Sequence, residues 1–172
     1  MRNTFLKELA TIDPAKIVYS DETGIDDNEV ILAGWALKGQ RCYAKKNAER
    51  NTRYNIIAVY NSEGQLFAPF LFEGYCNAET YATFLEEVFI PVSKPGMVLV
   101  LDNASFHKSK KIIAIVEQAQ CKILFLPPYS PDFNPIEHLW NTVKHKIRQA
   151  AIRTKDLYEA AILTLSDMCN AY

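Results

Sequence analysis

Short apolar runs bounded by turn residues dominate the first half of the chain. Such runs predict extended strands when they are rich in β-branched and aromatic residues, and a five-residue connection that contains glycine is typical of a hairpin. The segment Asn61-Ser-Glu-Gly-Gln65 is a connection of this kind. The pattern therefore predicts three or four antiparallel strands, at 16–20, 30–37, 54–60 and 66–72.

The second half of the chain has helical spacing and fully apolar strands. A stretch that begins near Asn77 has apolar residues at helical spacing and ends before Pro91. Residues 97–101 and 122–126 are continuously apolar, as expected of strands covered on both faces, and a helical pattern at 110–119 separates them. This arrangement predicts a βαβ unit with parallel strands and a right-handed crossover. Two terminal helices are predicted at 135–150 and 154–170.

The order of these elements predicts an α/β domain whose sheet is mixed. It matches a ribonuclease-H-like (retroviral-integrase-like) fold, which is a mixed five-stranded sheet flanked by helices. In this fold the first strand and the central parallel strand are neighbours, so Asp21 and Asp102 can meet although 81 positions separate them (102 − 21). The length of 172 residues fits one such domain at 13–172 after an N-terminal leader at 1–12.

Composition narrows the functional classes. The chain has no signal-peptide pattern near its start and no run of about 18 apolar residues, so we expect a cytoplasmic protein that is not embedded in a membrane. Its four cysteines are 34, 45 and 48 positions apart, which excludes the paired spacing of a zinc ribbon or a redox motif. The cysteines are Cys42, Cys76, Cys121 and Cys169.

The net charge of −1 taken alone argues against a DNA-binding module, which usually has a basic excess. The charges are segregated, however, because basic residues gather at 41–53 and at 144–155 while acidic residues gather at 13–29. For any one of these groups an ordinary solvated face is the favoured interpretation.

Two aspartates have the chemistry and placement of metal ligands. Mg²⁺-dependent cleavage of a phosphodiester needs hard oxygen ligands that hold two ions about 4 Å apart. Asp21 and Asp102 each directly follow an apolar run, where side chains project from the end of a sheet. Glu22 is the second candidate at the first position, and strand alternation places it on the opposite face. Asp102 by itself is better explained as a turn cap at a strand end.

Glu137 has both a structural and a functional interpretation. Asn134-Pro-Ile-Glu137 resembles an ideal helix start, in which the glutamate bonds back to the capping asparagine. Yet Glu137 also heads a face that is separate from the apolar stripe and suits a metal site beside a DNA backbone. The other residues of this face are Asn141, Lys144 and Arg148.

The three histidines do not form a metal site in the sequence. His138 and His145 are seven residues apart, which is roughly 10 Å along a helix, so we interpret them as surface or phosphate-contacting groups. His107 follows Asp102 by five residues and can reach the edge of the site as a DNA contact, but an ordinary loop histidine explains it equally well.

The segment 126–135 contains four prolines and joins a predicted buried strand to a predicted helix. Proline reduces the conformational freedom of the backbone. We therefore expect a stiff connector that holds Glu137 in a fixed position relative to Asp102.

Three segments, at 19–24 (YSDETG), 99–107 (LVLDNASFH) and 126–140 (LPPYSPDFNPIEHLW), resemble the signature blocks of a known family. That family is the mariner superfamily of DDE transposases, in its bacterial insertion-sequence branch. The resemblance extends from about residue 13 to about residue 148. It includes the spacing of 34 residues between Asp102 and Glu137 (137 − 102 − 1).

The resemblance implies that Asp21, Asp102 and Glu137 are the catalytic acids and metal ligands, and it selects Asp21 over Glu22. The implied cofactor is Mg²⁺, for which Mn²⁺ substitutes. The implied reaction is metal-dependent cleavage of DNA at the ends of an element, followed by attack of the freed 3′-hydroxyl on target DNA at a TA dinucleotide. A homodimer is the implied active form. The DNA contacts expected from the residues are His107, Asn141, Lys144 and Arg148.

One departure from the family concerns DNA recognition. Its members usually have helix-turn-helix domains before the catalytic core, whereas this chain begins close to the first predicted catalytic strand. We therefore expect that a separate reading frame supplies that half or that the chain is a fragment. Two alternative functions stay open at this point: a ribonuclease-H-like nuclease or resolvase, and a non-catalytic DNA-binding remnant.

Overall fold

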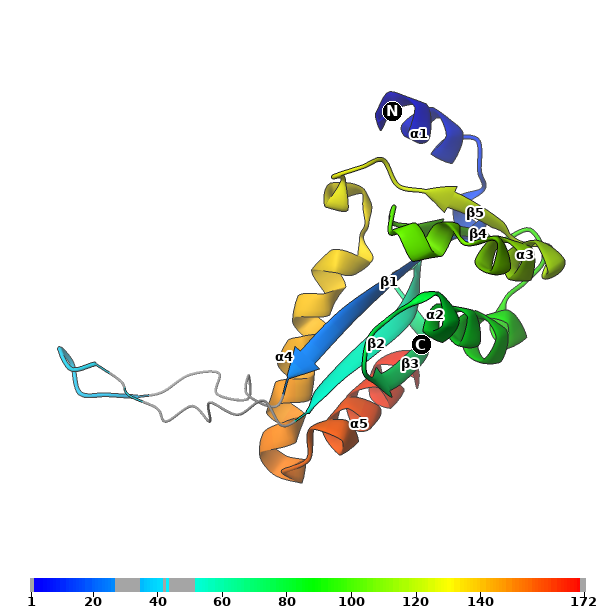
Figure 1. Ribbon diagram of the computed structural model, residues 1–172. Helices are drawn as coiled ribbons and strands as arrows, with labels where there is room; N and C mark the ends of the chain where they lie inside the picture. Colours follow the sequence, from blue (N-terminus) through cyan, green and yellow to red (C-terminus); the bar gives the residue numbers. More distant parts are fainter. Residues whose placement is uncertain (1, 27–34, 42, 44–51, 171–172) are drawn as a thin grey trace.

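A mixed five-stranded sheet forms the centre of the computed structural model, which describes residues 2–26, 35–41, 43 and 52–170 (Figure 1). The strand order is β3-β2-β1-β4-β5. β1 pairs antiparallel with β2, and β2 with β3, while β4 pairs parallel with both β1 and β5. The strands are β1 (Ile17–Asp26), β2 (Arg53–Asn61), β3 (Leu66–Glu73), β4 (Val98–Leu101) and β5 (Lys122–Phe125). The mixed sheet, the hairpin and the parallel βαβ unit predicted from the sequence are confirmed.

The first strand is longer than predicted. It extends to Asp26 instead of ending at residue 20, because β1 pairs with β2 along its whole length, down to the pair Asp26 and Arg53. Gly24 lies within this ladder and is not part of a turn. A Cβ atom at Gly24 would clash with the Arg53 guanidinium, so glycine makes room for that side chain. Asp21 therefore lies in the middle of a strand.

The strand predicted at 30–37 is absent from its last three residues, which are the part that the structure describes. Residues 27–34 lie outside the described residues, and 35–37 have no strand conformation.

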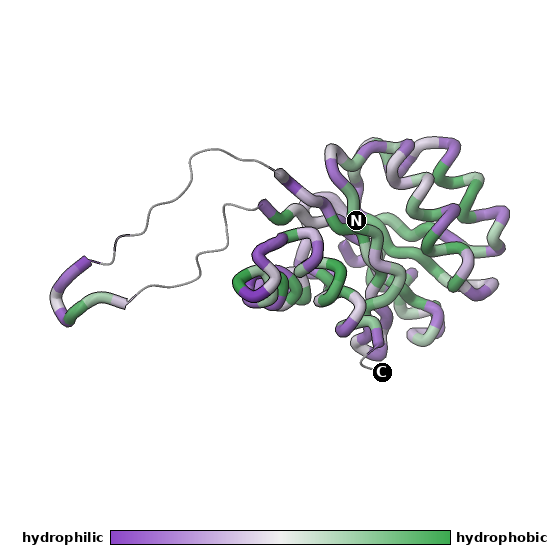
Figure 2. Tube along the Cα trace, turned by 90° about the horizontal axis from the view of Figure 1, so that it is seen from below, coloured by the Kyte–Doolittle hydropathy of each residue, from purple (hydrophilic) through white to green (hydrophobic). Residues whose placement is uncertain are grey.

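Two layers of helices cover the sheet (Figure 1). On one face, Val18, Ile57 and Leu99 pack against α2 (Ala78–Phe84) and α3 (Lys110–Gln118). On the other face, Ile25 and Ile56 pack against α4 (Ile136–Thr154) and α5 (Leu157–Asn170). Figure 2 shows the same division, because hydrophobic residues follow the strands while the helices alternate between hydrophobic and hydrophilic positions.

The helix boundaries follow local sequence signals. Asn77 caps α2 by accepting hydrogen bonds from the backbone N–H groups of Glu79 and Thr80, at 2.9 and 3.0 Å. The chain continues from α2 through a π-helical turn (Leu85–Phe89) and a 3₁₀ turn (Ile90–Val92), where Pro91 ends the helical path. Ser109 caps α3 in the same way as Asn77 caps α2.

A short N-terminal helix, α1 (Arg2–Leu9), packs on the side of β4 and β5. Its Phe5 is buried and stacks on Phe133 at 5.6 Å between ring centroids. The division into a leader at 1–12 and a domain at 13–172 stays a prediction. Among the described residues, no helix is both long enough and apolar enough to cross a membrane.

Candidate active site

The register of the sheet brings the two predicted aspartates together. β1 and β4 pair as Ile17 with Val98 and Tyr19 with Val100. Continuing this register by two residues aligns position 102 with position 21 across the sheet. β4 ends at Leu101, however, while β1 continues to Asp26. The sheet therefore opens next to the two aspartates.

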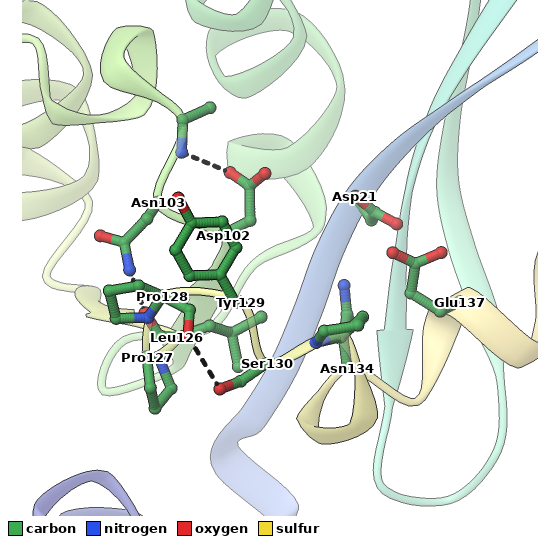
Figure 3. A pocket seen from close by; sticks show the side chains of 12 residues that line it. Asp21, Asp102, Asn103, Leu126, Pro127, Pro128, Tyr129, Ser130, Asn134 and Glu137 are labelled. Atoms are coloured by element: carbon green, nitrogen blue, oxygen red, sulfur yellow. Dashed lines mark hydrogen bonds between the residues drawn. The ribbon is translucent and has the colours of Figure 1, made fainter. Parts of the chain in front are cut away.

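A pocket occupies this opening, and all three predicted acids line it. Figure 3 shows Asp21 from β1 and Glu137 from α4 pointing toward one another, with Asp102 on the other side of the pocket. The remaining lining comes mainly from the segment between β5 and α4, which includes Tyr129 and Asn134.

Asp21 is held by a hydrogen bond from α4, the helix that packs on its face of the sheet. The indole N–H of Trp140 donates a hydrogen bond of 2.9 Å to Asp21 Oδ2. Burial raises the pKa of Asp21 to about 7, the Trp140 hydrogen bond opposes this shift, and the charge of Glu137 adds to it. A cation bound here would offset both the burial of the ionised Asp21 and its repulsion by Glu137.

Glu137 lies in the first turn of α4 but does not form the predicted capping box. The helix begins at Ile136, and no side chain caps it. Asn134 is buried, and its Oδ1 atom has no hydrogen-bond partner among the described residues. The residue at the cap position is Pro135, in helical conformation. The structural interpretation of Glu137 is therefore wrong, and its carboxylate lines the pocket.

Asp102 makes two hydrogen bonds through a single oxygen. Its Oδ1 accepts from the backbone N–H of Ala104 at 2.9 Å and from His107 Nδ1 at 2.7 Å. The hydrogen bond from His107 lowers the pKa of Asp102 against the effect of burial. Asp102 is therefore both a turn cap and a pocket carboxylate, so the two interpretations are compatible.

His107 is not placed as a surface DNA contact. Only 1% of its surface is exposed, and its ring packs against Tyr81 and Phe106 at centroid distances of 4.4 and 4.2 Å. This burial argues against the direct DNA contact expected from the sequence. The histidine instead contacts Asp102 and lies near Glu22, with 3.9 Å between His107 Nε2 and Glu22 Oε2.

Glu22 faces away from Asp21, as strand alternation predicts. It lies on the side of α2, where burial raises its pKa, the charge of His107 lowers it, and the charge of Asp102 raises it. Burial also raises the pKa of Cys76 to about 12, and the neighbouring Glu22 adds to this shift. The five-residue spacing to Asp102 predicted His107 at the edge of the site, but that prediction did not connect His107 with Glu22 or Cys76.

The connector between β5 and α4 is anchored at its start. The side chain of Asn103 donates a hydrogen bond to the Leu126 carbonyl, and Leu126 N–H donates to the Leu101 carbonyl at 2.7 Å. Tyr129 follows two prolines with a φ of 53° and is 99% exposed. The ends of β4 and β5 are thus tied to the segment that leads to Glu137.

The other residues of the predicted α4 face, Asn141, Lys144 and Arg148, do not line the pocket. Asn141 is exposed, while Lys144 and Arg148 are half-buried, and all three follow Glu137 along the helix. His138 and His145 are exposed on the same helix. Of the other basic segment, Lys45, Lys46 and Arg50 lie outside the described residues.

Comparison with known families identifies the domain. Residues 16–158 match the family described as DDE superfamily endonuclease. The chain belongs to this family. The match begins just before β1 and ends in α5, so this DDE endonuclease domain contains all five strands and all three acids.

Two curated proteins illustrate the relationship of the DDE endonuclease domain. It is 23% identical over 133 residues to the insertion element IS630 uncharacterized 39 kDa protein of Shigella sonnei, covering 76% of this chain and 38% of that protein. It is 35% identical over 72 residues to the transposable element Tcb2 transposase of Caenorhabditis briggsae, covering 40% of this chain and 26% of that protein. The chain thus spans less than half the length of either protein.

Solved structures confirm the fold. The Mos1 transposase in a paired-end complex with the left transposon end superposes with a TM-score of 0.67 at 16% identity, covering 98% of this chain and 57% of that one. The catalytic core domain of BIV integrase superposes with a TM-score of 0.58 at 12% identity, covering 89% and 82%. The DDE endonuclease domain therefore has the predicted ribonuclease-H-like fold.

The donor set of the pocket fits divalent metal ions, which enzymes of the DDE superfamily use. Among the described residues, no three His, Cys, Asp or Glu side chains converge closely enough to hold a single ion. Mg²⁺ rarely needs such a cage, because it usually binds one or two carboxylates together with water and substrate phosphates. Asp21 with Glu137 on one side and Asp102 on the other provide hard oxygen ligands of that kind.

Proposed function

We propose that this chain is the catalytic domain of a DNA transposase, which cleaves phosphodiester bonds at the ends of an element and joins the freed 3′-hydroxyl to target DNA. The observation that carries the proposal is the convergence of Asp21, Asp102 and Glu137, from three separate elements, on one pocket. The membership in the DDE endonuclease family and the transposase names of its relatives support it.

Each acid has a distinct supporting structure. Asp21 is held by the Trp140 indole, and Asp102 by His107 and the Ala104 backbone. Glu137 lies at the N-terminal end of α4, directly after the proline-rich connector. Mg²⁺, or Mn²⁺ in its place, would bind these carboxylates and supply Lewis-acid stabilisation of the attacking and leaving oxygens. The residues of the chain would fix where those oxygens lie.

The proposed partner is DNA, both as transposon ends and as a target at TA. The neighbouring Mos1 structures are transposase complexes, one of them a paired-end complex with the left transposon end. We propose an active homodimer and a helix-turn-helix half, fused or separate, that recognises the element's ends. In this proposal Lys144 and Arg148, which follow Glu137 along α4, contact the DNA backbone.

The first test is Asp102→Asn in a cleavage and strand-joining assay with Mg²⁺ or Mn²⁺ and DNA that carries the element's ends. We expect activity to fall at least about 100-fold, because lost charge stabilisation of several kcal/mol corresponds to two or more factors of ten. Asp167→Asn on the exposed side of α5 is the matched control and should leave activity unchanged.

Two outcomes would contradict the proposal. Cleavage that persists unchanged in Asp102→Asn would show that the pocket is not the active site. Cleavage that depends on Asp102 but is never followed by strand joining would indicate a nuclease or resolvase, because joining to target DNA distinguishes a transposase.

A further inference from the structure

A chain of polar side chains adjoins Asp102, and its central member, His107, is buried. It runs from the Asp102 carboxylate to the His107 ring and on to Glu22 of β1. His107 Nδ1 lies 2.7 Å from Asp102 Oδ1, and His107 Nε2 lies 3.9 Å from Glu22 Oε2. His107 and Glu22 do not belong to the three acids, so their role in the site needs its own explanation.

The two carboxylate oxygens of Asp102 differ in their hydrogen bonds. Oδ1 receives both donors, the Ala104 N–H and the His107 ring. Within the described part of the chain, no donor reaches Oδ2. An ionised carboxylate only accepts hydrogen bonds, so the short contact requires the proton to be on Nδ1 of His107. This arrangement fixes the carboxylate plane and leaves Oδ2 available to the pocket.

The ring of His107 has little freedom to turn. It is 1% exposed and lies 4.4 Å from the Tyr81 ring and 4.2 Å from the Phe106 ring, measured between centroids. Tyr81 is itself fixed, because its hydroxyl donates to Ser20 Oγ at 3.0 Å. The aromatic walls thus set the direction of the Nδ1–H bond.

The far side of the ring faces an acid. His107 Nε2 and Glu22 Oε2 are both buried, and neither has a hydrogen-bond partner among the described residues. The two atoms are 3.9 Å apart, which is too long for a hydrogen bond, and Glu22 also interacts with the Cys76 thiol. A polar group buried in this way costs free energy, which a purely structural position would avoid by using an apolar residue.

Turn capping does not require His107. The Ala104 N–H already satisfies Asp102 as a cap at the strand end. The second hydrogen bond to the same oxygen therefore adds orientation. Such partners of metal-binding carboxylates typically change metal affinity about 10- to 100-fold when they are removed.

We propose that His107 is a positioning residue that orients the Asp102 carboxylate through its Nδ1–H. This inference rests on the proposed function, in which Asp102 binds metal. It explains why a polar histidine is buried between the Tyr81 and Phe106 rings.

The test compares two amide variants in the purified full chain with Mn²⁺ alone as the probe. His107→Asn places an amide N–H near the position of Nδ1, whereas His107→Gln places one near Nε2. Mn²⁺ affinity is measured by the enhancement of water-proton relaxation, and folding by thermal melting without metal. We expect His107→Asn to bind within about threefold of wild type and His107→Gln to bind about 10- to 100-fold more weakly.

A second measurement needs no variant. The chain has three histidines, so nitrogen-15 NMR of histidine-labelled protein can resolve the His107 ring. We expect a proton on Nδ1 that exchanges slowly with water. A ring protonated only on Nε2 would overturn the inference, even if a variant failed to fold.

The controls distinguish a failure of the proposed metal site from a failure of the positioning role of His107. If wild type binds no Mn²⁺, or if Asp102→Asn binds it equally well, the proposed metal site fails and the positioning role fails with it. If Asp102 is required but the two His107 variants have equal affinity, whether high or low, only the positioning role of His107 is overturned.

Discussion

At the scale of single residues, Asp21 shows how the fold prepares an acid for a cation. It is mostly buried, it lies beside Glu137, and its pKa is raised to about 7 from an ordinary value of 3.8, mainly by burial. A metal-free protein therefore bears a cost whenever Asp21 is ionised. Bound metal would remove that cost, which links folding stability, pH and metal binding at one side chain.

This linkage gives a prediction for Asp21→Asn. Folding raises the pKa of Asp21, so the folded state holds a proton that the unfolded state releases, and the stability of metal-free wild type falls between about pH 4 and pH 7. The asparagine keeps an acceptor for Trp140 without the charge. At pH 8 in EDTA we expect the free energy of unfolding of Asp21→Asn to exceed that of wild type by about 1–3 kcal/mol, which a higher melting temperature would show.

The pH series supplies the control for this prediction. At pH 4 the two proteins should melt at similar temperatures, since Asp21 is then neutral in the folded wild type. Adding Mg²⁺ at pH 8 should raise the melting temperature of wild type and leave that of Asp21→Asn nearly unchanged. Equal melting temperatures at pH 8 in EDTA would refute the linkage.

The sequence predicted the acids better than it predicted their surroundings. Asp102 and Glu137 lie in continuous motifs, so local pattern and family resemblance could find them. The Trp140 contact to Asp21 joins positions 119 apart. Trp140 belongs to the buried apolar face of α4, and that pattern gives no sign of a polar contact. His107 was close to Asp102 in sequence, but its burial depends on Tyr81 of α2, which no local pattern reveals.

At the scale of elements, β1 and α4 carry most of the site. β1 supplies Asp21 on one face and Glu22 on the other, and α4 supplies Glu137 and, one turn later, Trp140. The end of β1 was mispredicted because Thr23-Gly24 resembles a turn. Pairing with β2 outweighs that local preference.

The position of α4 should depend on its buried face. Ile147 is fully buried against the sheet and α5, whereas Ile152 on the same helix is 61% exposed. We expect Ile147→Ala to lower the free energy of unfolding by about 2–5 kcal/mol. Ile152→Ala should change it by less than about 0.5 kcal/mol. Chemical denaturation measures both, and similar losses in the two variants would show that α4 packs differently.

At the scale of the whole molecule, strand order and register create the pocket. The parallel unit formed by β4, α3 and β5 was predictable, since continuous apolar runs and a helix between them leave few alternatives. The opening beside β1 was not predictable, because it arises from the unequal lengths of β1 and β4. The near-neutral net charge likewise conceals the basic residues of α4, which the sequence showed as a cluster and the structure places on a helix that begins at the pocket.

That surface leads to a prediction about DNA affinity. Lys144 lies about two helical turns after Glu137 on the same side of α4, whereas Lys146 lies about half a turn around the helix from that side. If DNA enters the pocket along this side, Lys144→Ala should weaken binding to duplex DNA several-fold and reduce the salt dependence by about one released ion. Lys146→Ala lowers the net charge by the same amount, so comparing the two variants separates the effect of position on α4 from that of net charge. We expect Lys146→Ala to weaken DNA binding less than about twofold. Fluorescence anisotropy at several salt concentrations gives both quantities. Equal losses in the two variants would mean that DNA is attracted by overall charge and is not guided along α4 to the acids.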